Sequence, residues 1–297
     1  MFLNVETNRS LEVFTKIYKP YKITKVNQVY IFNTMDGDYV IKLNPKINYR
    51  KLYNYLYSRS FTYIPSLSID SRDDMVVLGY QEDLNIDLNQ KILDMIEVIG
   101  LLHSKTSYYK DVTLDRYKEI YQNIKDNLLF MEGYYDKYFN LFLESYYNSP
   151  SEYLLLRSYS VIEGAIKYSL DNLDSWYSIV SNKSRERVCL VHNNLKLEHF
   201  IKNQDAYLVS WDHYTYDTLV LDLFGLYRNE WENVSFKEVI DAYNSVNSML
   251  EEETLLFNVL ISMPFKVEFD SNEYEKCRNL RRLISYLDKS ANMVLDN

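Results

Sequence analysis

The side chains best suited to chemistry lie between residues 192 and 222. This stretch carries the imidazoles of His192, His199 and His213 and the carboxylates Asp212 and Asp222. An imidazole suits zinc or another transition metal, whereas Mg²⁺ prefers carboxylates and other oxygen ligands. His192 and His199 are seven residues apart on a loop-to-strand transition, and none of the 4 histidines of the chain shows metal-ligand spacing. We therefore expect structural histidines here rather than a metal site.

Other catalytic signatures are missing from the sequence. It contains no G-x-S-x-G, H-E-x-x-H, Walker or C-x-x-C motif. It has only 6 Gly, whereas a nucleotide-binding loop usually needs several so that backbone N–H groups can approach phosphate. Its two cysteines, Cys189 and Cys277, cannot build a disulfide framework or a thiolate zinc site. Cys189 lies in an apolar run, so we interpret it as a buried small hydrophobe.

The elements that must position these residues begin with a small strand-rich unit. Strand-like runs at 22–32 and 37–43 flank the turn TMDG. Apolar residues at helical spacing predict a helix over 48–59. Two further short strands are predicted at 64–69 and 75–80, which completes a strand-rich first segment.

The rest of the chain is predicted to be mainly helical. Helical spacing begins near residue 83 and runs through about 113–145 and 150–184. A β segment at 188–191 and a hairpin that turns at Asn203–Asp205 interrupt the helices, which resume after about residue 220. The sequence therefore predicts a β-rich lobe at 1–82 and a helical lobe at 83–297, which contains the β segment and hairpin of residues 188–212.

The segment LVHNNLKLEHFIKNQDAYLVSWDHYTYDTLVLDLFGLYR, residues 190–228, resembles the catalytic core of the aminoglycoside phosphotransferase and choline kinase-like family. That family has a loop H-G-D-x-x-x-x-N, a hairpin, an I-D-[FW]-[DE] motif and then an Asp-Leu pair. Here the loop begins at His192, and Asp222 lies twelve residues after Ser210, which is the family's spacing. The resemblance implies an α+β, bilobal, protein-kinase-like fold with a small β-rich lobe and a large helical lobe.

The resemblance also implies a role for each matching residue. Lys42, in YVIKL, matches the strand lysine that contacts the nucleotide phosphates. Asn194 occupies the position of the catalytic base, while His199 and Ser210 occupy the two metal-ligand positions. His192 and Asp222 match residues that are mainly architectural and support the loop.

The chemistry of the family does not carry over with its fold. An amide cannot accept a proton from a substrate hydroxyl at neutral pH, so Asn194 is a degenerate base. The lysine's glutamate partner is missing, since no Asp or Glu occurs between Leu43 and Ile69. An imidazole and a hydroxyl suit Mg²⁺ poorly. Asp212 is the substitute carboxylate, and a register shifted by two residues would put it in the metal position.

Glu198 and Asp217 are the other acidic neighbours of this region, and we interpret them as solvated loop charges. No cofactor is assigned from these residues. ATP, with or without Mg²⁺, is the candidate ligand that the resemblance implies.

Three functions fit these observations. The first is a pseudokinase that acts as a scaffold or ligand sensor, similar to the kinase-like proteins of bacterial spore coats of the CotS and YutH types. The second is an active ATP-dependent phosphotransferase on a small hydroxyl- or amine-containing metabolite, which would use Asp212. The third is a helical interaction protein without a ligand. We favour the first, because several contributions to phosphoryl transfer are missing together.

Composition also narrows the possible partners and the cellular location. The 297 residues include 33 Lys+Arg and 42 Asp+Glu, a net charge of −9, which argues against a nucleic-acid partner. The N-terminus lacks signal-peptide features, and no apolar run reaches the roughly 18 residues of a membrane span. We expect a soluble protein in a reduced cytosol, with an unknown protein or small-molecule partner. Arg278, Arg281 and Arg282 are interpreted as a solvated helix face, with a docking surface for an acidic partner as the alternative.

Overall fold

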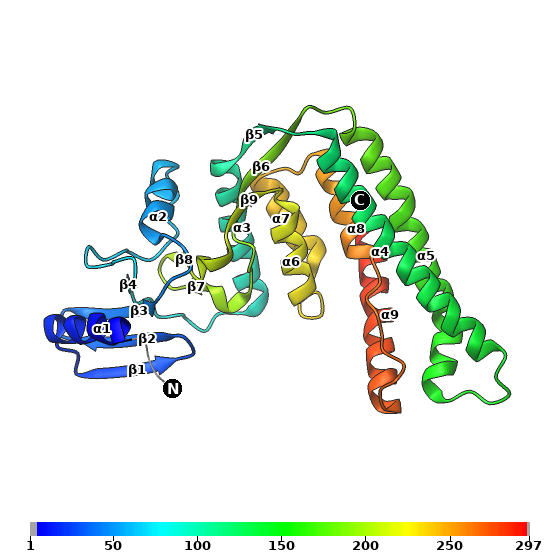
Figure 1. Ribbon diagram of the computed structural model, residues 1–297, viewed down its shortest axis with the longest axis horizontal. Coiled ribbons are helices and arrows are strands. Elements are labelled where there is room, and N and C mark those ends of the chain that lie inside the picture. Colours follow the sequence, from blue (N-terminus) through cyan, green and yellow to red (C-terminus); the bar gives the residue numbers. More distant parts are fainter. Residues whose placement is uncertain (1–4, 296–297) are drawn as a thin grey trace. The chain divides into compact units, whose positions relative to one another are not determined.

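A four-stranded antiparallel sheet carries the first of the predicted site residues (Figure 1). The structure is a computed structural model that describes residues 5–295. The strands follow one another in chain order, so that each pairs with the next along the sequence. They are β1 (Lys22–Val26), β2 (Val29–Thr34), β3 (Gly37–Leu43) and β4 (Met75–Gly79).

The single strand predicted at 22–32 is in fact two strands, β1 and β2. Val26 pairs with Val29, so only Asn27 and Gln28 form the turn between them. Asn27 has a φ of 52°, in the left-handed region that asparagine tolerates better than most residues. The prediction missed this turn because it contains neither glycine nor proline.

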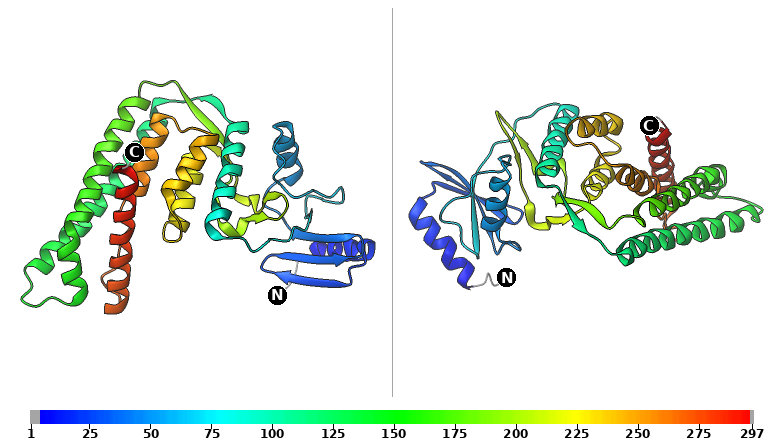
Figure 2. Two further views of the ribbon diagram at one scale, coloured as in Figure 1. Left: turned by 180° about the vertical axis from the view of Figure 1, so that it is seen from behind. Right: turned by 90° about the horizontal axis from the view of Figure 1, so that it is seen from above.

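Helix α1 (Val5–Tyr18) packs against this sheet, as Figures 1 and 2 show. Phe14 is 1% exposed and joins Phe32 and Ile41 in a buried cluster. The rings of Phe14 and Phe32 meet edge to face at 5.5 Å. The helix therefore closes the apolar side of the strands, which a sheet of this size needs for stability.

The segment predicted as a strand at 64–69 is not one. It precedes β4 in the chain and forms only an isolated bridge to it, between Leu67 and Leu78, since Pro65 has no N–H to donate to a ladder. The helix predicted at 48–59 is confirmed as α2 (Tyr49–Ser58). The side chain of Asn48 caps it by accepting a hydrogen bond from Lys51 N at 2.9 Å.

The predicted hairpin is also confirmed, as β7 (Phe200–Lys202) and β8 (Ala206–Leu208). It belongs to the same compact unit as the sheet, together with helix α3 (Leu88–Thr106). Lys202 of β7 connects the hairpin to α3, because its Nζ lies 3.2 Å from the Asp94 carboxylate of that helix. The backbone N–H of Lys202 also donates a hydrogen bond to the side chain of Asp83. This first unit comprises residues 1–106 and 192–215. It therefore extends past residue 82, where the sequence predicts the boundary between the lobes, and it also includes the hairpin.

The second unit, residues 107–191 and 216–297, is mainly helical. The long helices α4 (Leu114–Leu143) and α5 (Pro150–Val180) lie side by side (Figures 1 and 2). Helix α5 also packs on α8 (Glu251–Ser262) and α9 (Glu273–Leu295). The unit also contains α6 (Val220–Glu230) and α7 (Phe236–Val246). Its sheet consists of β5 (Tyr108–Asp111), β6 (Arg185–Val191) and β9 (Thr215–Asp217), of which only Thr215 is assigned to the first unit.

Within residues 5–295, no helix combines the length and the hydropathy that crossing a bilayer requires.

Candidate functional site

Lys42 extends from the middle of the first sheet. It lies on β3, opposite Val29 of β2 and Val76 of β4. Its side chain is only 18% exposed, although a lysine is rarely buried without a partner. In protein kinases the phosphate-binding lysine likewise lies on the third strand.

Asp212 supplies the partner of Lys42. Its carboxylate Oδ2 forms an ion pair and hydrogen bond with Lys42 Nζ, and its side chain is 13% exposed. Asp212 lies in a short 3₁₀ turn, Trp211–His213, that begins directly after Ser210. Ser210 has a φ of 66°, which turns the chain so that the carboxylate faces the sheet. The structure thus brings Asp212, not Ser210, to Lys42.

Tyr49 is the third member of this cluster. It is the first residue of α2 and is 4% exposed. Its hydroxyl makes a long hydrogen bond of 3.5 Å to Asp212 Oδ1, and its ring lies 6.0 Å from Lys42 Nζ. Burial first, and then the charge of Asp212, raise the pKa of the Tyr49 hydroxyl. The hydroxyl therefore stays protonated and can only donate to Asp212.

Sequence reasoning missed Tyr49. The search in this helix was for an acidic residue, and there is none. The apolar face of the helix did include Tyr49, but nothing in its spacing showed that the hydroxyl meets a carboxylate 163 residues away.

His192 lies beneath the loop that follows β6. It is fully buried, and its Nε2 lies 2.8 Å from the carbonyl oxygen of Val209. Its ring packs against the indole of Trp211, with the ring centroids 4.8 Å apart. Trp211 is also fully buried and donates a hydrogen bond from Nε1 to the Leu208 carbonyl at 2.9 Å. The turn that carries Asp212 is therefore anchored by a buried aromatic pair.

The predicted base and metal-ligand positions contact each other. His199 Nδ1 lies 2.7 Å from the backbone carbonyl of Asn194, so Nδ1 carries a proton and donates. Its Nε2 lies 3.6 Å from the Glu198 carboxylate, which is 68% exposed. Asn194 itself is half-buried, and its side chain ends in an amide. This contact holds the loop, and the Asn194 amide cannot accept a proton from a substrate at neutral pH.

Asp217 and Asp222 belong to the second unit. Asp217, expected to be a solvated loop charge, accepts hydrogen bonds from Arg116 Nη2 at 3.0 Å and Thr218 N at 2.8 Å. Asp222 is 1% exposed in the first turn of α6. Cys189, as expected, is buried at 1% exposure, and burial raises the pKa of its thiol. A thiol in this state is unreactive.

The cluster at Lys42 offers few protein ligands to a nucleotide with Mg²⁺. Among the described residues, no group of three His, Cys, Asp or Glu side chains is arranged to hold a metal ion. The turn between β1 and β2, which covers the phosphates in protein kinases and is rich in glycine there, is Asn27–Gln28. The one carboxylate of this cluster, Asp212, is paired with Lys42, whereas Mg²⁺ is usually bound by one or two carboxylates together with phosphates and water.

Comparisons with known proteins establish the fold. No protein-family model and no curated protein matches the chain. An aminoglycoside phosphotransferase from Alicyclobacillus acidocaldarius superposes with a TM-score of 0.66 at 10% identity, over 93% of this chain and 91% of that one. A spectinomycin phosphotransferase in an AMP-bound complex gives 0.52 at 10% identity, over 97% and 94%. A glucosamine kinase gives 0.51 at 11% identity, over 93% and 75%. The predicted α+β, kinase-like fold is confirmed.

Proposed function

We propose that this chain is a pseudokinase of the aminoglycoside phosphotransferase and choline kinase-like family, which acts as a scaffold or ligand sensor without transferring a phosphoryl group. One observation carries the proposal. In the described part of the chain, the carboxylate that pairs with Lys42 is Asp212, and that carboxylate is held by Lys42 and Tyr49. The strand lysine and the substitute metal ligand therefore neutralise each other.

Phosphoryl transfer depends on positioned charge more than on covalent chemistry by the protein. The cation must contact phosphate, a carboxylate must hold the metal, and a base must orient the acceptor hydroxyl. Here Lys42 and Asp212 are bound to each other, and Asn194 cannot take a proton. Each missing contribution costs rate, and their joint loss leaves binding and positioning alone.

Fold support is the role we propose for His192 and Asp222. Both are buried, and the contact of His192 with Val209 and Trp211 supports this role for it. A chain that keeps these buried residues but has an amide in place of the catalytic base can retain a kinase-like fold and serve a different function, since fold alone does not fix function.

The second candidate function is an ATP-dependent phosphotransferase acting on a small hydroxyl- or amine-containing metabolite. The observation in its favour is that Asp212 faces Lys42 instead of solvent. A nucleotide that drew Lys42 onto its phosphates would release this carboxylate for a metal ion. The absence of a base at Asn194 weighs against this candidate.

The setting we propose is the cytoplasm of a bacterium, with association to the spore coat. It is supported by the resemblance to coat-type kinase-like proteins and by exposed tyrosines suited to an assembled layer, such as Tyr146 at 90% and Tyr147 at 85% exposure. Immunoblots of spore coat extract against cytosol would test it, and a protein confined to the cytosol of sporulating cells would contradict it.

The test of the function is ATP turnover. We expect purified protein with ATP and Mg²⁺ to release no ADP above a protein-free blank. The same result is expected with aminoglycosides, choline or glucosamine added as acceptors. The pseudokinase proposal is wrong if ADP is released and the release disappears in both Lys42→Ala and Asp212→Asn. Release that persists in both variants would identify a contaminating kinase.

A further inference from the structure

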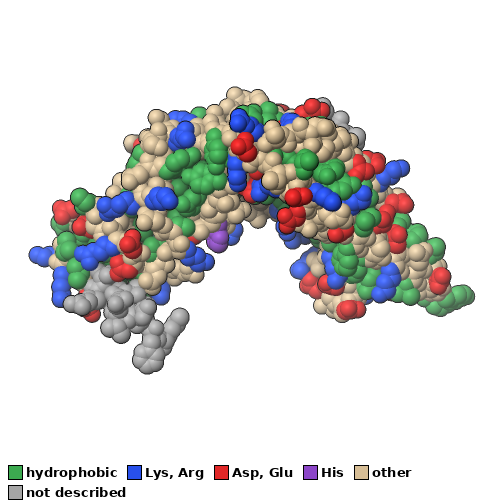
Figure 3. Space-filling view, turned by 45° about the horizontal axis from the view of Figure 1, so that its top comes forward, with side chains coloured by type: hydrophobic (Ala, Val, Ile, Leu, Met, Phe, Trp, Pro, Cys, Tyr) green, Lys and Arg blue, Asp and Glu red, His purple; other side chains and the backbone are tan. Residues whose placement is uncertain are grey.

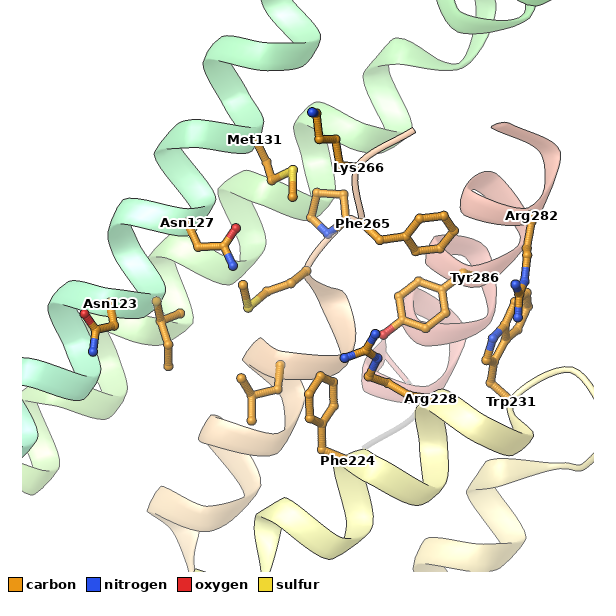
Figure 4. Close-up of a pocket in the computed structure, with 14 residues that line it drawn as sticks. Asn123, Asn127, Met131, Phe224, Arg228, Trp231, Phe265, Lys266, Arg282 and Tyr286 are labelled. Carbon is orange, nitrogen blue, oxygen red and sulfur yellow. The ribbon is translucent and has the colours of Figure 1, made fainter. Parts of the chain in front are cut away.

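A cavity in the second unit has no role in the proposed function. It is about 600 Å³ in volume, within the range of sites that hold small organic ligands. Its walls come from α4, α6, α9 and the end of α8 with the residues that follow it (Figure 4). Because all of these belong to one compact unit, the cavity is a feature of that unit by itself.

The charge of the lining has a single sign. Three cationic side chains, Arg228, Lys266 and Arg282, line the cavity, and no Asp or Glu of the described chain does. The chain as a whole carries a net charge of −9, and on the face drawn in Figure 3 basic and acidic side chains are intermixed. The lining is therefore basic although the chain as a whole is acidic, and its positive charge favours the binding of an anion.

Arg228 is the cation best placed to receive that anion. Lys266 already pairs with Glu268 at 2.8 Å, and Arg282 with Glu232 at 2.8 Å. Arg228 makes no ion pair with any described residue, and its guanidinium lies 5.7 Å from the Phe224 ring centroid. Figure 4 shows it directed toward Tyr286. An arginine offers a planar set of donors that matches a carboxylate, sulfonate or phosphate head.

An aromatic wall forms the apolar side of the cavity. Tyr286 meets Trp231 edge to face at 5.3 Å and Phe265 at 5.8 Å. Trp231 is 4% and Tyr286 5% exposed, so their positions are fixed by packing before any ligand arrives. Rigid aromatic surfaces bury an apolar or aromatic body at low cost in side-chain entropy.

We propose that this cavity binds a small organic anion, with an aromatic or apolar body against Trp231, Tyr286 and Phe265 and its anionic head at Arg228. The inference stands independently of the nucleotide question, because it rests on residues of the second unit alone.

The probe we choose is 8-anilinonaphthalene-1-sulfonate, an aromatic anion whose fluorescence rises in an apolar site. N-phenyl-1-naphthylamine is its uncharged counterpart. We expect saturable binding of the sulfonate to the full chain. Arg228→Met should weaken this binding by about tenfold or more, because it removes a charge-assisted contact, and Arg228→Lys should weaken it less. Binding of the uncharged probe should not change in Arg228→Met.

The matched control is Arg278→Met. Arg278 lies on α9, pairs with Glu275 and does not line the cavity, so this variant makes the same charge change elsewhere on the unit. It should leave both affinities as in the unaltered protein. Circular dichroism identifies variants that fold, and Arg228→Gln replaces Arg228→Met if the latter does not. Equal sulfonate affinity with and without Arg228, equal affinity for the charged and uncharged probes, or no saturable binding would each overturn the proposal.

Discussion

Replacing Glu253 with alanine is expected to lower the free energy of unfolding by about 3 kcal/mol. Glu253 is 5% exposed and forms a two-pronged ion pair with Arg187, in which Arg187 Nε donates to Oε1 at 2.9 Å. It also accepts a hydrogen bond from Leu250 N at 2.8 Å, which caps α8. Alanine would leave the Arg187 guanidinium, 15% exposed, without its carboxylate, and would uncap the helix.

Urea denaturation of the variants measures this loss. Glu251→Ala is the matched control, because Glu251 is exposed in the same first turn of α8, and it should change stability by no more than about 0.5 kcal/mol. Glu253→Gln should fall between the two, since it keeps a hydrogen-bond acceptor but loses the charge. A Glu253→Ala protein as stable as Glu251→Ala would show that this pair does not hold the second unit together.

Replacing Asp212 with alanine should cost about 2 kcal/mol. The Lys42 ammonium would remain largely buried without a counter-charge, and the buried Tyr49 hydroxyl would lose its acceptor. The cost is smaller than for Glu253, because residual exposure of both side chains, 18% and 13%, lets water replace part of the interaction.

Two further variants make this prediction specific to the pair. Lys42→Met combined with Asp212→Ala should recover part of the loss, because no buried charge is then left alone. Asp111→Ala removes a carboxylate whose partner, Arg185, is exposed at 67%, so it should cost no more than about 1 kcal/mol. Urea unfolding of Asp212→Ala that matches Asp111→Ala would mean that Lys42 is not held by Asp212 in solution.

Two of the elements around the site could be predicted from short stretches of sequence. The hairpin at 200–208 and helix α2 carry turn and periodicity signals that need no tertiary information. Helix α1 carries a comparable signal in Leu11, Phe14 and Tyr18, spaced three and four residues apart, although we predict no element there from the sequence. Its burial against Phe32 gives it its place in the fold.

The cluster at Lys42 could not be read from spacing in the sequence. Asp212 meets Lys42 across 170 residues, and the residue that turns it inward is Ser210, held in a left-handed conformation. Serine carries no sequence signal for that conformation, as glycine would. The aromatic and basic cavity was missed for a similar reason. Its walls come from four separate stretches of chain, and only Arg282 had been noticed, as part of a helix face.

The most direct test of the pseudokinase proposal is the dependence of nucleotide binding on Mg²⁺. Thermal melts are recorded with ATP or ADP, each in Mg²⁺ and in EDTA, with Mg²⁺ alone as the control. A ligand at about one hundred times its dissociation constant adds about 2.7 kcal/mol to the free energy of unfolding, which raises the melting midpoint by several degrees for a chain of this size.

Lys42→Ala should remove a midpoint shift caused by binding at Lys42, whereas Arg228→Met should remove one caused by binding in the cavity of the second unit. We predict that any Lys42-dependent shift is the same in Mg²⁺ and in EDTA. A shift that appears only with Mg²⁺ and disappears in Asp212→Asn would contradict the account.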